Sequence, residues 1–322
     1  MLRLLRDGSV HSQRQLAHEL GIADSSVADC VEALESLGVA VRRSAQRDYC
    51  LSSAIDWLDR DKVMRALGES APRFEVEIHD SVVSTNTLLS ERSALGARTG
   101  LCVAAEWQSG GRGRRGRAWR SSLGGVLTFS LLWRSARGVA SLTGLSLAVG
   151  VAIARALEAA GTGGIKLKWP NDLLCGQRKV GGILIEIEGG SPTASAAIIG
   201  IGLNVELPAN VRMAIDQPVT DLTSAMDKRP ERNRLLASLL AGLHATLVRF
   251  DAEGLTPFRA DWAHYNAYQN CEVNVLTPDG ASTRGRMTGI GHDGALLLAT
   301  AAGERRYTVG DVSLRRRDDP GH

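Results

Sequence analysis

The sequence has few cysteines, and none of them lies close to another. Five cysteines are spread over 322 residues, and no C-x-x-C pair occurs. This spacing is typical of reduced thiols and argues against a disulfide framework. The seven histidines are scattered as well. We therefore expect no metal site built from a cluster of protein ligands.

A long hydrophobic segment is also missing. The N-terminus, MLRLLRDG, has no apolar core of the signal-peptide kind. An uncharged run of 17 residues, Gly138–Ala154, is rich in small side chains and is shorter than the roughly 20 apolar residues that a membrane span needs. We expect a buried helix there, no membrane association, and a cytoplasmic protein.

Negative charge is absent from one segment of a nearly neutral chain. The formal net charge is +3, yet residues 107–157 hold eight arginines and no Asp or Glu. Half of these arginines fall in GGRGRRGRAW, residues 110–119. Arginine has forked donors that suit phosphate and carboxylate, and glycines let a backbone approach a ligand. The segment predicts a loop that becomes ordered around an anion.

The same loop contains a G-x-G-x-x-G spacing at Gly111, Gly113 and Gly116. A dinucleotide-binding loop of that spacing follows a strand, opens a helix, and has an acidic residue about 20 positions later. Here a loop and a second strand follow Gly116, so we reject that interpretation. Two alternatives stay open: a solvated basic loop, and a nucleic-acid-binding loop in which Trp107 and Trp119 stack on bases.

Residues 1–53 have the pattern of a small separate module. Ser12 begins a helix that Gly21 ends, and a second helix with apolar residues at helical spacing follows. Gly38 ends that helix, and a basic, alternating ribbon completes the module. This order predicts a winged helix-turn-helix DNA-binding domain, with Gln13 to Glu32 as the helix-turn-helix. A plain helical hairpin is the alternative.

The charges of this module are unusual for a DNA-binding protein. Residues 13–37 contain five acids and one arginine, whereas phosphate contacts favour positive charge. Arg42, Arg43 and Arg47 on the wing partly compensate. The module therefore either binds an operator or serves only as a structural domain. The segment before Ser12 is short for a first helix, which leaves open whether the N-terminus is complete.

The rest of the chain divides into three parts. Residues 54–72 are polar and predict a helical connector. Residues 73–268 alternate apolar strands with helices and predict a largely antiparallel sheet, and residues 269–322 predict a small β-barrel. The fold class is therefore α+β, with several domains. The clearest elements are helices at Leu142–Ala160 and Asn233–Phe250, and turns at 170–172, 189–190, 278–280 and 292–294.

Four further segments carry polar groups that plain secondary structure does not need. The run Ser84–Asn86 precedes an apolar helix, where a cap accounts for only one of its three side chains. The run Lys168–Asp172, KWPND, puts a cation, a ring and an amide–carboxylate pair on one turn, which could also be a simple hairpin turn. Lys179 stands in an apolar strand, and the glycines of GIGLN, residues 200–204, let a ligand approach.

These motifs together resemble those of biotin protein ligases. Ser84–Asn86, Gln108 with GRGRRGR, KWPNDL, RKVGGIL and GIGLN occur in the order and spacing of that family. With a winged helix in front, essentially the whole chain is similar to the bifunctional biotin ligase and biotin-operon repressor. The resemblance implies a central mixed α/β domain of the biotin/lipoate ligase type and a C-terminal SH3-like β-barrel. A lipoate or octanoate ligase fits the arginine–glycine loop and KWPND less well.

The resemblance implies a biotin–[acetyl-CoA-carboxylase] ligase. With ATP and Mg²⁺, it would form biotinyl-5′-AMP and transfer biotin to a lysine of a biotin carboxyl carrier protein. It also implies a repressor that binds biotin operator DNA, with biotinyl-5′-AMP as corepressor and a homodimer as the bound form. The alternatives are a biotin-sensing repressor with weak or lost ligase activity, and a ligase whose N-terminal domain no longer binds DNA.

The resemblance also implies roles for individual residues. Lys179, Arg112 and Arg114 would be catalytic, beside the biotin carboxylate and the α-phosphate. The roles of Arg115 and Arg117 stay open, with loop folding or the dimer as the alternatives to ligand contact. Biotin and its adenylate would contact Ser84, Thr85, Asn86, Gln108, Gly111, Arg112, Gly113, Arg114, Lys179, Gly182, Gly200 and Gly202. The nucleotide or the acceptor would approach Asn171, Asp172, Asn204 and Arg315.

Overall fold

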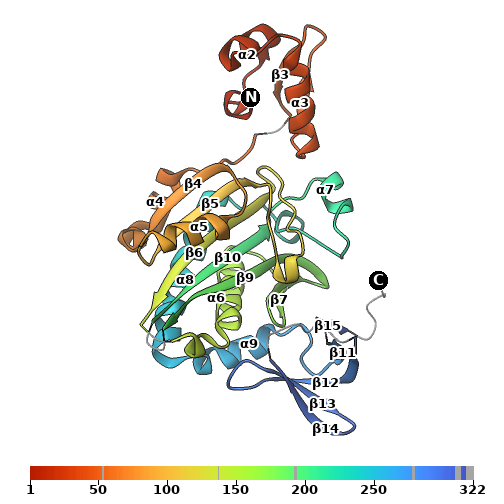
Figure 1. Cartoon of the computed structure of the whole chain (residues 1–322). Helices are drawn as coiled ribbons and strands as arrows, with labels where there is room; N and C mark the ends of the chain where they lie inside the picture. The colour runs from red at the N-terminus through yellow and green to blue at the C-terminus, as the bar shows by residue number, and fades with distance from the viewer. Residues whose placement is uncertain (53, 137, 192–193, 278–279, 309–312, 317–322) are drawn as a thin grey trace.

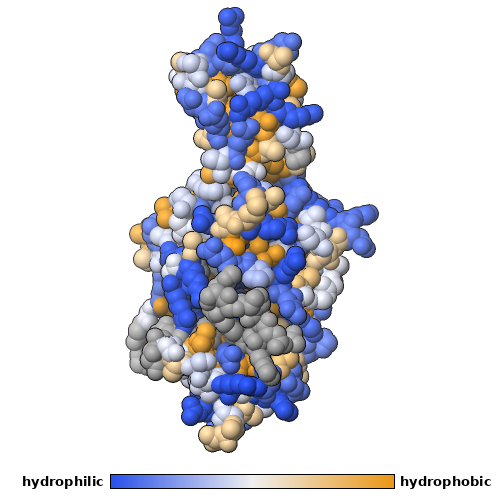
Figure 2. Space-filling model, turned by 90° about the vertical axis from the view of Figure 1, so that its right-hand side faces the viewer, coloured by the Kyte–Doolittle hydropathy of each residue, from blue (hydrophilic) through white to orange (hydrophobic). Residues whose placement is uncertain are grey.

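The computed structural model describes residues 1–52, 54–136, 138–191, 194–277, 280–308 and 313–316. These residues form an N-terminal lobe, a central α/β body and a C-terminal β region (Figure 1). In the side view of Figure 2 the lobe stands above the body on a narrower waist. Within the described ranges the strands form three sheets.

The N-terminal lobe combines short helices with a small sheet ordered β1-β3-β2. Ser12 Oγ accepts a hydrogen bond from the Gln15 backbone at 3.2 Å and caps one helix, which Gly21 ends in the left-handed conformation. The helices and the ribbon lie where the sequence predicts them. The elements are α1 (Leu2–Leu5), β1 (His11–Ser12), α2 (Gln13–Leu20), α3 (Ser26–Ser36), β2 (Val41–Arg43) and β3 (Asp48–Leu51).

The central sheet has the strand order β4-β5-β6-β10-β9-β8-β7. Only β4 and β5 are parallel, so the prediction of a largely antiparallel sheet is confirmed. The strands are β4 (Glu75–Val82), β5 (Leu101–Gln108), β6 (Val126–Ser135), β7 (Ile165–Lys168), β8 (Asp172–Cys175), β9 (Arg178–Ser191) and β10 (Ala194–Asn204).

One predicted turn in this sheet is wrong. The Gly189-Gly190 pair does not end the strand, because β9 continues to Ser191. The ladder between β9 and β10 shifts register at these glycines, between Glu188 and Ser191, and Gly189 has a φ of 96°. A glycine can take that conformation without strain, so the pair serves an irregularity within the ladder. The predicted turn at 170–172 does join β7 to β8.

Helices cover both faces of the central sheet (Figure 1). Alternate residues of β5 face opposite sides, so Leu101 and Val103 pack with α5 while Cys102 and Ala104 pack in the core of α6 and α8. Two segments, Val139–Ala159 and Arg232–Glu253, have the length and composition of membrane spans, but half or more of each is buried inside the protein. The long helices are α5 (Thr85–Ala94), α6 (Leu145–Ala159) and α8 (Arg232–Glu253).

The C-terminal sheet, ordered β14-β13-β12-β11-β15, shares a core with the body. Trp169 Nε1 donates to the Gly294 carbonyl at 3.1 Å and links the two. The turn at 292–294 joins β12 to β13 as predicted, whereas the one at 278–280 falls partly outside the described residues. The strands are β11 (Glu272–Leu276), β12 (Ser282–Ile290), β13 (Leu296–Thr300), β14 (Gly303–Tyr307) and β15 (Ser313–Arg316).

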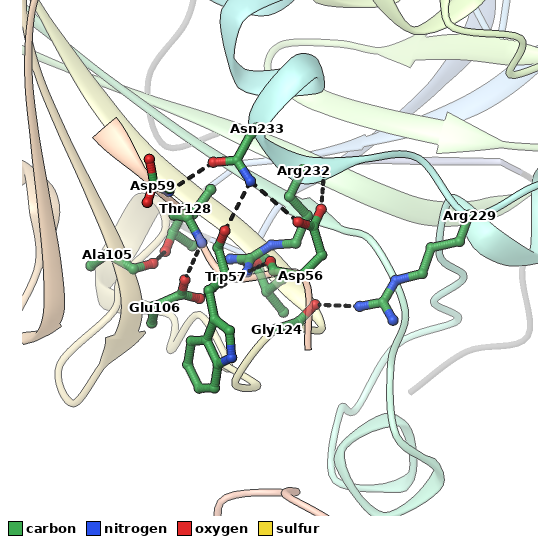
Figure 3. A network of polar contacts seen from close by, with 12 residues as sticks. Asp56, Trp57, Asp59, Ala105, Glu106, Gly124, Thr128, Arg229, Arg232 and Asn233 are labelled. Atoms are coloured by element: carbon green, nitrogen blue, oxygen red, sulfur yellow. Dashed lines mark hydrogen bonds and ion pairs between the residues drawn. The ribbon is translucent and has the colours of Figure 1, made fainter. Parts of the chain in front are cut away.

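A buried polar network holds the chain that leaves the N-terminal lobe (Figure 3). Arg232 and Glu106 have exposed side-chain fractions of 0% and 4% and pair at 2.8 Å. Arg232 also donates to the Asp56 carbonyl at 2.8 Å, and Glu106 accepts the Leu58 amide at 2.6 Å. Asn233 donates to the Asp56 carboxylate at 3.2 Å. The start of the predicted connector is thus fastened to α8 and β5.

The second half of the predicted connector packs into the body. It forms a helix, α4, from which Val63 and Leu67 enter the core beside α8. Asp59 caps this helix by accepting the Lys62 amide at 2.9 Å. The remaining short helices are α4 (Arg60–Leu67), η1 (Gly68–Arg73), η2 (Arg114–Gly116), η3 (Val139–Leu142), α7 (Ala209–Met213), η4 (Thr223–Ala225), η5 (Thr256–Phe258) and α9 (Arg259–Tyr265).

Candidate active site

A cleft of about 630 Å³ opens over the central sheet. Segments far apart in sequence meet there, because β6, β10, β9 and β8 are neighbours in the sheet and α5 begins beside them. The cleft also takes residues 214–218, Tyr268 and Leu314 from outside the predicted motifs. The predicted site residues that line it are Ser84, Thr85, Asn86, Gln108, Arg112, Gly113, Arg114, Asn171, Asp172, Lys179, Gly182, Gly200 and Gly202.

Uncharged polar side chains from α5 and β5 form part of the cleft wall. Ser84 is the N-cap residue of α5, but its side chain makes no capping bond. Gln108 on β5 takes that role: its Oε1 accepts the Thr85 backbone N–H at 2.7 Å and lies 3.1 Å from Thr85 Oγ1. The Ser84–Asn86 run therefore presents its side chains to the cleft and to β5, and it does not cap its own helix.

Asn86 is held by two residues that the sequence analysis missed. Its Nδ2 donates to Glu186 Oε2 at 2.6 Å, and its Oδ1 accepts from Ser130 Oγ at 2.6 Å. A Cβ at Gly200 would lie 2.2 Å from Asn86 Oδ1, so only glycine leaves room for this amide. Ser130 is the lone hydroxyl in the apolar run FSLLW, a signal that could have been noticed.

The cleft wall also carries cations that are paired with acids or amides. Lys179 Nζ lies 2.6 Å from Asp172 Oδ1, with 18% and 24% of the two side chains exposed. Arg112 contacts Glu186 at 3.0 Å and donates to Thr87 Oγ1 at 2.6 Å. Arg114 Nη1 donates to Asn171 Oδ1 at 3.4 Å, while Asn171 Nδ2 donates to the Ile183 carbonyl at 2.6 Å. An incoming anionic ligand could take the place of these acidic and amide side chains as the partner of the cations.

The arginine loop folds as a short hairpin beside the cleft. Arg112 and Ala118 form an antiparallel bridge, and Gly113 N–H donates to the Arg117 carbonyl at 2.7 Å. Arg115, with a φ of 60°, lies at the tip. Gly111 does not line the cleft: a Cβ there would lie 2.8 Å from the Trp119 carbonyl. That glycine lets the two arms of the hairpin meet.

The two tryptophans that flank the loop face different surroundings. Trp119 lies against β10, where a Cβ at Gly202 would come within 2.5 Å of its ring. Trp107 packs against the core of the N-terminal lobe. They do not form one stacking surface, so the structure does not support the nucleic-acid interpretation of this loop.

Besides Gly111, two predicted residues lie elsewhere than the cleft wall. Asn204 is buried, and its amide donates to the carbonyls of Thr220, at 3.0 Å, and Lys179, at 3.5 Å. Asn204 thus holds the segment at Thr220 against Lys179 of β9. Arg315 lies on β15 opposite Asn274, with its side chain outside the described part. Among the described residues, no three His, Cys, Asp or Glu side chains form a metal cluster.

Comparison with known proteins decides the family. The chain is 34% identical to the bifunctional ligase/repressor BirA of Salmonella typhimurium, over 98% of this chain and 96% of the relative. The chain belongs to the biotin protein ligase family. Residues 79–204 match the biotin/lipoate A/B protein ligase family, and residues 270–315 match the biotin protein ligase C terminal domain. It is thus a ligase that is similar over nearly its whole length to a bifunctional ligase/repressor.

Two ligases match a smaller share of this chain. The biotin–[acetyl-CoA-carboxylase] ligase of Mycobacterium tuberculosis is 30% identical over 79% of this chain and 98% of its own. The biotin protein ligase from Aquifex aeolicus, in complex with biotin and ATP, has a TM-score of 0.64 and 29% identity, covering 75% of this chain and 99% of that one.

The N-terminal lobe of this biotin ligase carries mixed charge. Asp29 and Glu32 are exposed on α3. Arg42 and Arg47 are exposed on the ribbon, while Arg43 pairs with Glu35 at 2.5 Å. The pairing turns part of the ribbon's positive charge toward α3 and away from an outside partner.

Proposed function

We propose that the cleft joins biotin to AMP and then transfers biotin to a lysine of a biotin carboxyl carrier protein. The biotin carboxylate attacks the α-phosphorus of ATP, an O–P bond forms, and pyrophosphate leaves with its bridging oxygen. The acceptor lysine then attacks the acyl carbon, and AMP leaves. Both nucleophiles belong to substrates, so the protein supplies positioning and charge stabilisation.

The observation that carries this proposal is that one cleft wall combines uncharged polar side chains with cations. Thr85 and Gln108 suit a neutral ureido ring, and the cations suit the carboxylate and phosphate. Lys179 would stabilise charge at the α-phosphate, and Arg112 and Arg114 would hold the anionic junction. Gly182, Gly200 and Gly202 would let backbone and ring atoms close around the ligand.

The nucleotide side rests on fewer contacts. Mg²⁺ takes oxygen ligands and bridges phosphates to one or two carboxylates, and Asn171 and Asp172 present such oxygens at the cleft. These two side chains would hold the Mg²⁺ that enters with ATP. Arg315 follows Leu314, which lines the cleft, so we keep it as a basic residue for the ATP side.

Biotin-dependent exchange of radiolabelled pyrophosphate into ATP tests the first step. We expect exchange that requires biotin and Mg²⁺, followed by labelling of a carrier domain when one is added. Purified protein without exchange under these conditions would leave the alternative of a biotin-sensing repressor that has lost ligase activity.

We propose further that residues 1–53 are a winged helix-turn-helix that binds biotin operator DNA. The order of α2, α3 and the β2–β3 ribbon supports it, with Gln13 to Glu32 toward the groove and Arg42, Arg43 and Arg47 on the wing. The wing arginines would contact phosphates, so we expect binding that weakens with salt, and we expect it to strengthen with biotin and ATP. A gel shift indifferent to both ligands favours a purely structural lobe.

The remaining assignments complete the proposal. We propose that the chain divides into an N-terminal domain (1–53), a connector (54–72), a catalytic domain (73–268) and a C-terminal domain (269–322). The C-terminal domain would be an SH3-like barrel. We propose a homodimer when biotinyl-5′-AMP is bound, and a cytoplasmic protein with no membrane association. Sedimentation with and without biotin and ATP tests the dimer, because the sedimentation coefficient should rise only when both are present.

A further inference from the structure

Lys179 lies where the regular pairing of the central sheet ends. On one side it pairs with Leu174 of β8, just past a register shift. On the other side the ladder between β9 and β10 ends at the pair Gly181–Leu203. Lys179 also lines the cleft, where its ammonium group would meet the α-phosphate. The position of that group therefore depends on what holds the Lys179 backbone beyond the end of this ladder.

Residues 218–220 take the place of β10 beside Lys179. The Lys179 backbone N–H donates to the Pro218 carbonyl at 2.9 Å, and the Thr220 backbone N–H donates to the Lys179 carbonyl at 2.9 Å. These two hydrogen bonds form a parallel bridge between Lys179 and Val219. A short segment outside the strands of the sheet thus holds the Lys179 backbone.

A buried carboxylate closes this segment at its base. Asp221 is 2% exposed, and its Oδ2 accepts the Leu207 backbone N–H at 3.0 Å. Its Oδ1 accepts the Ser224 backbone N–H at 2.8 Å. Arg212, on α7 within the segment, pairs with the same carboxylate. A carboxylate removed from water needs such donors and a cation, so these contacts hold residues 207, 212 and 224 around Asp221.

Apolar packing alone does not fix where this segment lies along β9. Leu207 and Val219 are buried together with Val126, but apolar contacts are non-directional and tolerate small shifts. Hydrogen bonds and the ion pair of Asp221 depend on both distance and direction. The closure at Asp221 therefore determines the position of residues 218–220.

We propose that Asp221 and Arg212 are positioning residues for Lys179. They close the segment from Leu207 to Asp221, and residues 218–220 then hold the Lys179 backbone so that its ammonium group meets the α-phosphate. The inference rests on the proposed function for the role of Lys179. Neither Asp221 nor Arg212 is among the residues that line the cleft, so both act without touching the ligand.

Arg212→Gln tests the inference, because it removes the cation from a buried carboxylate that keeps its two backbone donors. We expect biotin-dependent pyrophosphate exchange at saturating biotin and ATP to slow by roughly 10-fold, because a small displacement of a catalytic group lowers the rate. The KM values for biotin and ATP should change by less than about threefold, since the interaction that is lost is made in the transition state. Arg212→Lys restores the charge and should recover most of the rate.

The decisive comparison repeats Arg212→Gln in a Lys179→Ala background. A residue that acts through Lys179 has nothing left to position there, so the second substitution should change the exchange rate by less than about twofold. Equal slowing in both backgrounds would overturn the inference. It would mean that residues 214–218, which line the cleft, act on the ligand directly.

A matched control removes a neighbouring arginine. Arg229 pairs with Glu206 at 2.9 Å and donates to the Gly124 carbonyl at 3.0 Å (Figure 3), and 32% of its side chain is exposed against 35% for Arg212. Arg229→Gln should therefore keep the wild-type exchange rate. If Arg212→Gln does not fold, Asp221→Asn, which keeps one accepting oxygen, decides in its place.

Two further outcomes separate this inference from the proposed function. Wild-type exchange rates in both Arg212→Gln and Asp221→Asn would overturn the inference and leave the proposed function standing. A wild type that catalyses no exchange would overturn the proposed function, and the role given to Lys179 with it.

Discussion

Two groups of charged side chains in this protein are built from the same residue types but differ in burial. Around Arg232 and Glu106 the charges are enclosed, and backbone groups of Asp56, Leu58 and Val126 complete the network. In the cleft, Lys179 pairs with Asp172 and Arg112 with Glu186, and each of these side chains remains partly exposed.

The difference shows how burial separates a structural ion pair from a functional one. A charge taken out of water is expensive unless its partners stay in place, so the Arg232 network fixes the chain near Asp56 in one arrangement. A partly exposed ion pair contributes little to the free energy of unfolding, because water can replace either partner. The cleft cations can therefore exchange an acidic side chain for a ligand anion without loss of the fold.

The largest expected effect comes from breaking the buried pair. Glu106→Ala leaves Arg232 charged and unpaired, and should lower the free energy of unfolding by about 3 kcal/mol or more. Denaturant titration measures it. Glu272→Ala, which breaks an exposed pair with Arg284, should cost less than about 1 kcal/mol. Equal losses in the free energy of unfolding for the two variants would contradict the claim that burial separates the two kinds of ion pair.

The next effect is on activity and should leave stability nearly unchanged. Lys179→Ala should slow biotin-dependent pyrophosphate exchange by about 100-fold, because one preorganised cation is lost at the α-phosphate. Lys166→Ala is the control: that lysine lies on β7 outside the cleft and donates to the His264 carbonyl at 3.0 Å. Normal exchange in the Lys179 variant would contradict our site.

A smaller effect concerns the helix beside the buried network. Asp59→Ala removes the cap of α4 and should cost about 1 kcal/mol, whereas Asp59→Asn should keep most of it. The hydrogen bond from the Lys62 amide lowers the pKa of Asp59 below its ordinary value. The contribution of this charge is therefore present above about pH 4 and is lost as the pH falls through the lowered pKa. Urea unfolding midpoints of the wild type and the two variants at pH 7 and pH 3 test both the cost of losing the cap and its dependence on pH.

The smallest effect is a pH dependence from α8. Burial lowers the pKa of His244, which packs edge-on against Phe74 and Trp133, and the charge of Arg73 adds to this. The unfolded chain then binds the proton more readily, so stability falls as the pH drops below about 6.5. His244→Phe should remove this component of the urea midpoint between pH 7.5 and 5.5. An unchanged slope would show that other groups cause it.

The sequence predicted much of the sheet and most of the cleft wall for identifiable reasons. Apolar runs marked β5 and β9, and glycines or charges within apolar runs marked Gly200 and Lys179. The roles of Ser130 and Glu186 were missed because they depend on Asn86, which is 44 and 100 residues away in the sequence. Arg232 was missed because its burial depends on Glu106, which is 126 residues away in the sequence.

The sequence by itself determined the order of elements, the local positive charge of residues 107–157 and the motifs of a biotin ligase. These follow from periodicity, composition and spacing, which are local properties. Only the tertiary structure decided which cations face the cleft and that Asn204 supports a neighbouring segment. It also decided that Asn86 forms hydrogen bonds with Ser130 and Glu186. Hydrogen-bond direction and desolvation depend on atoms that the fold brings together from distant parts of the chain.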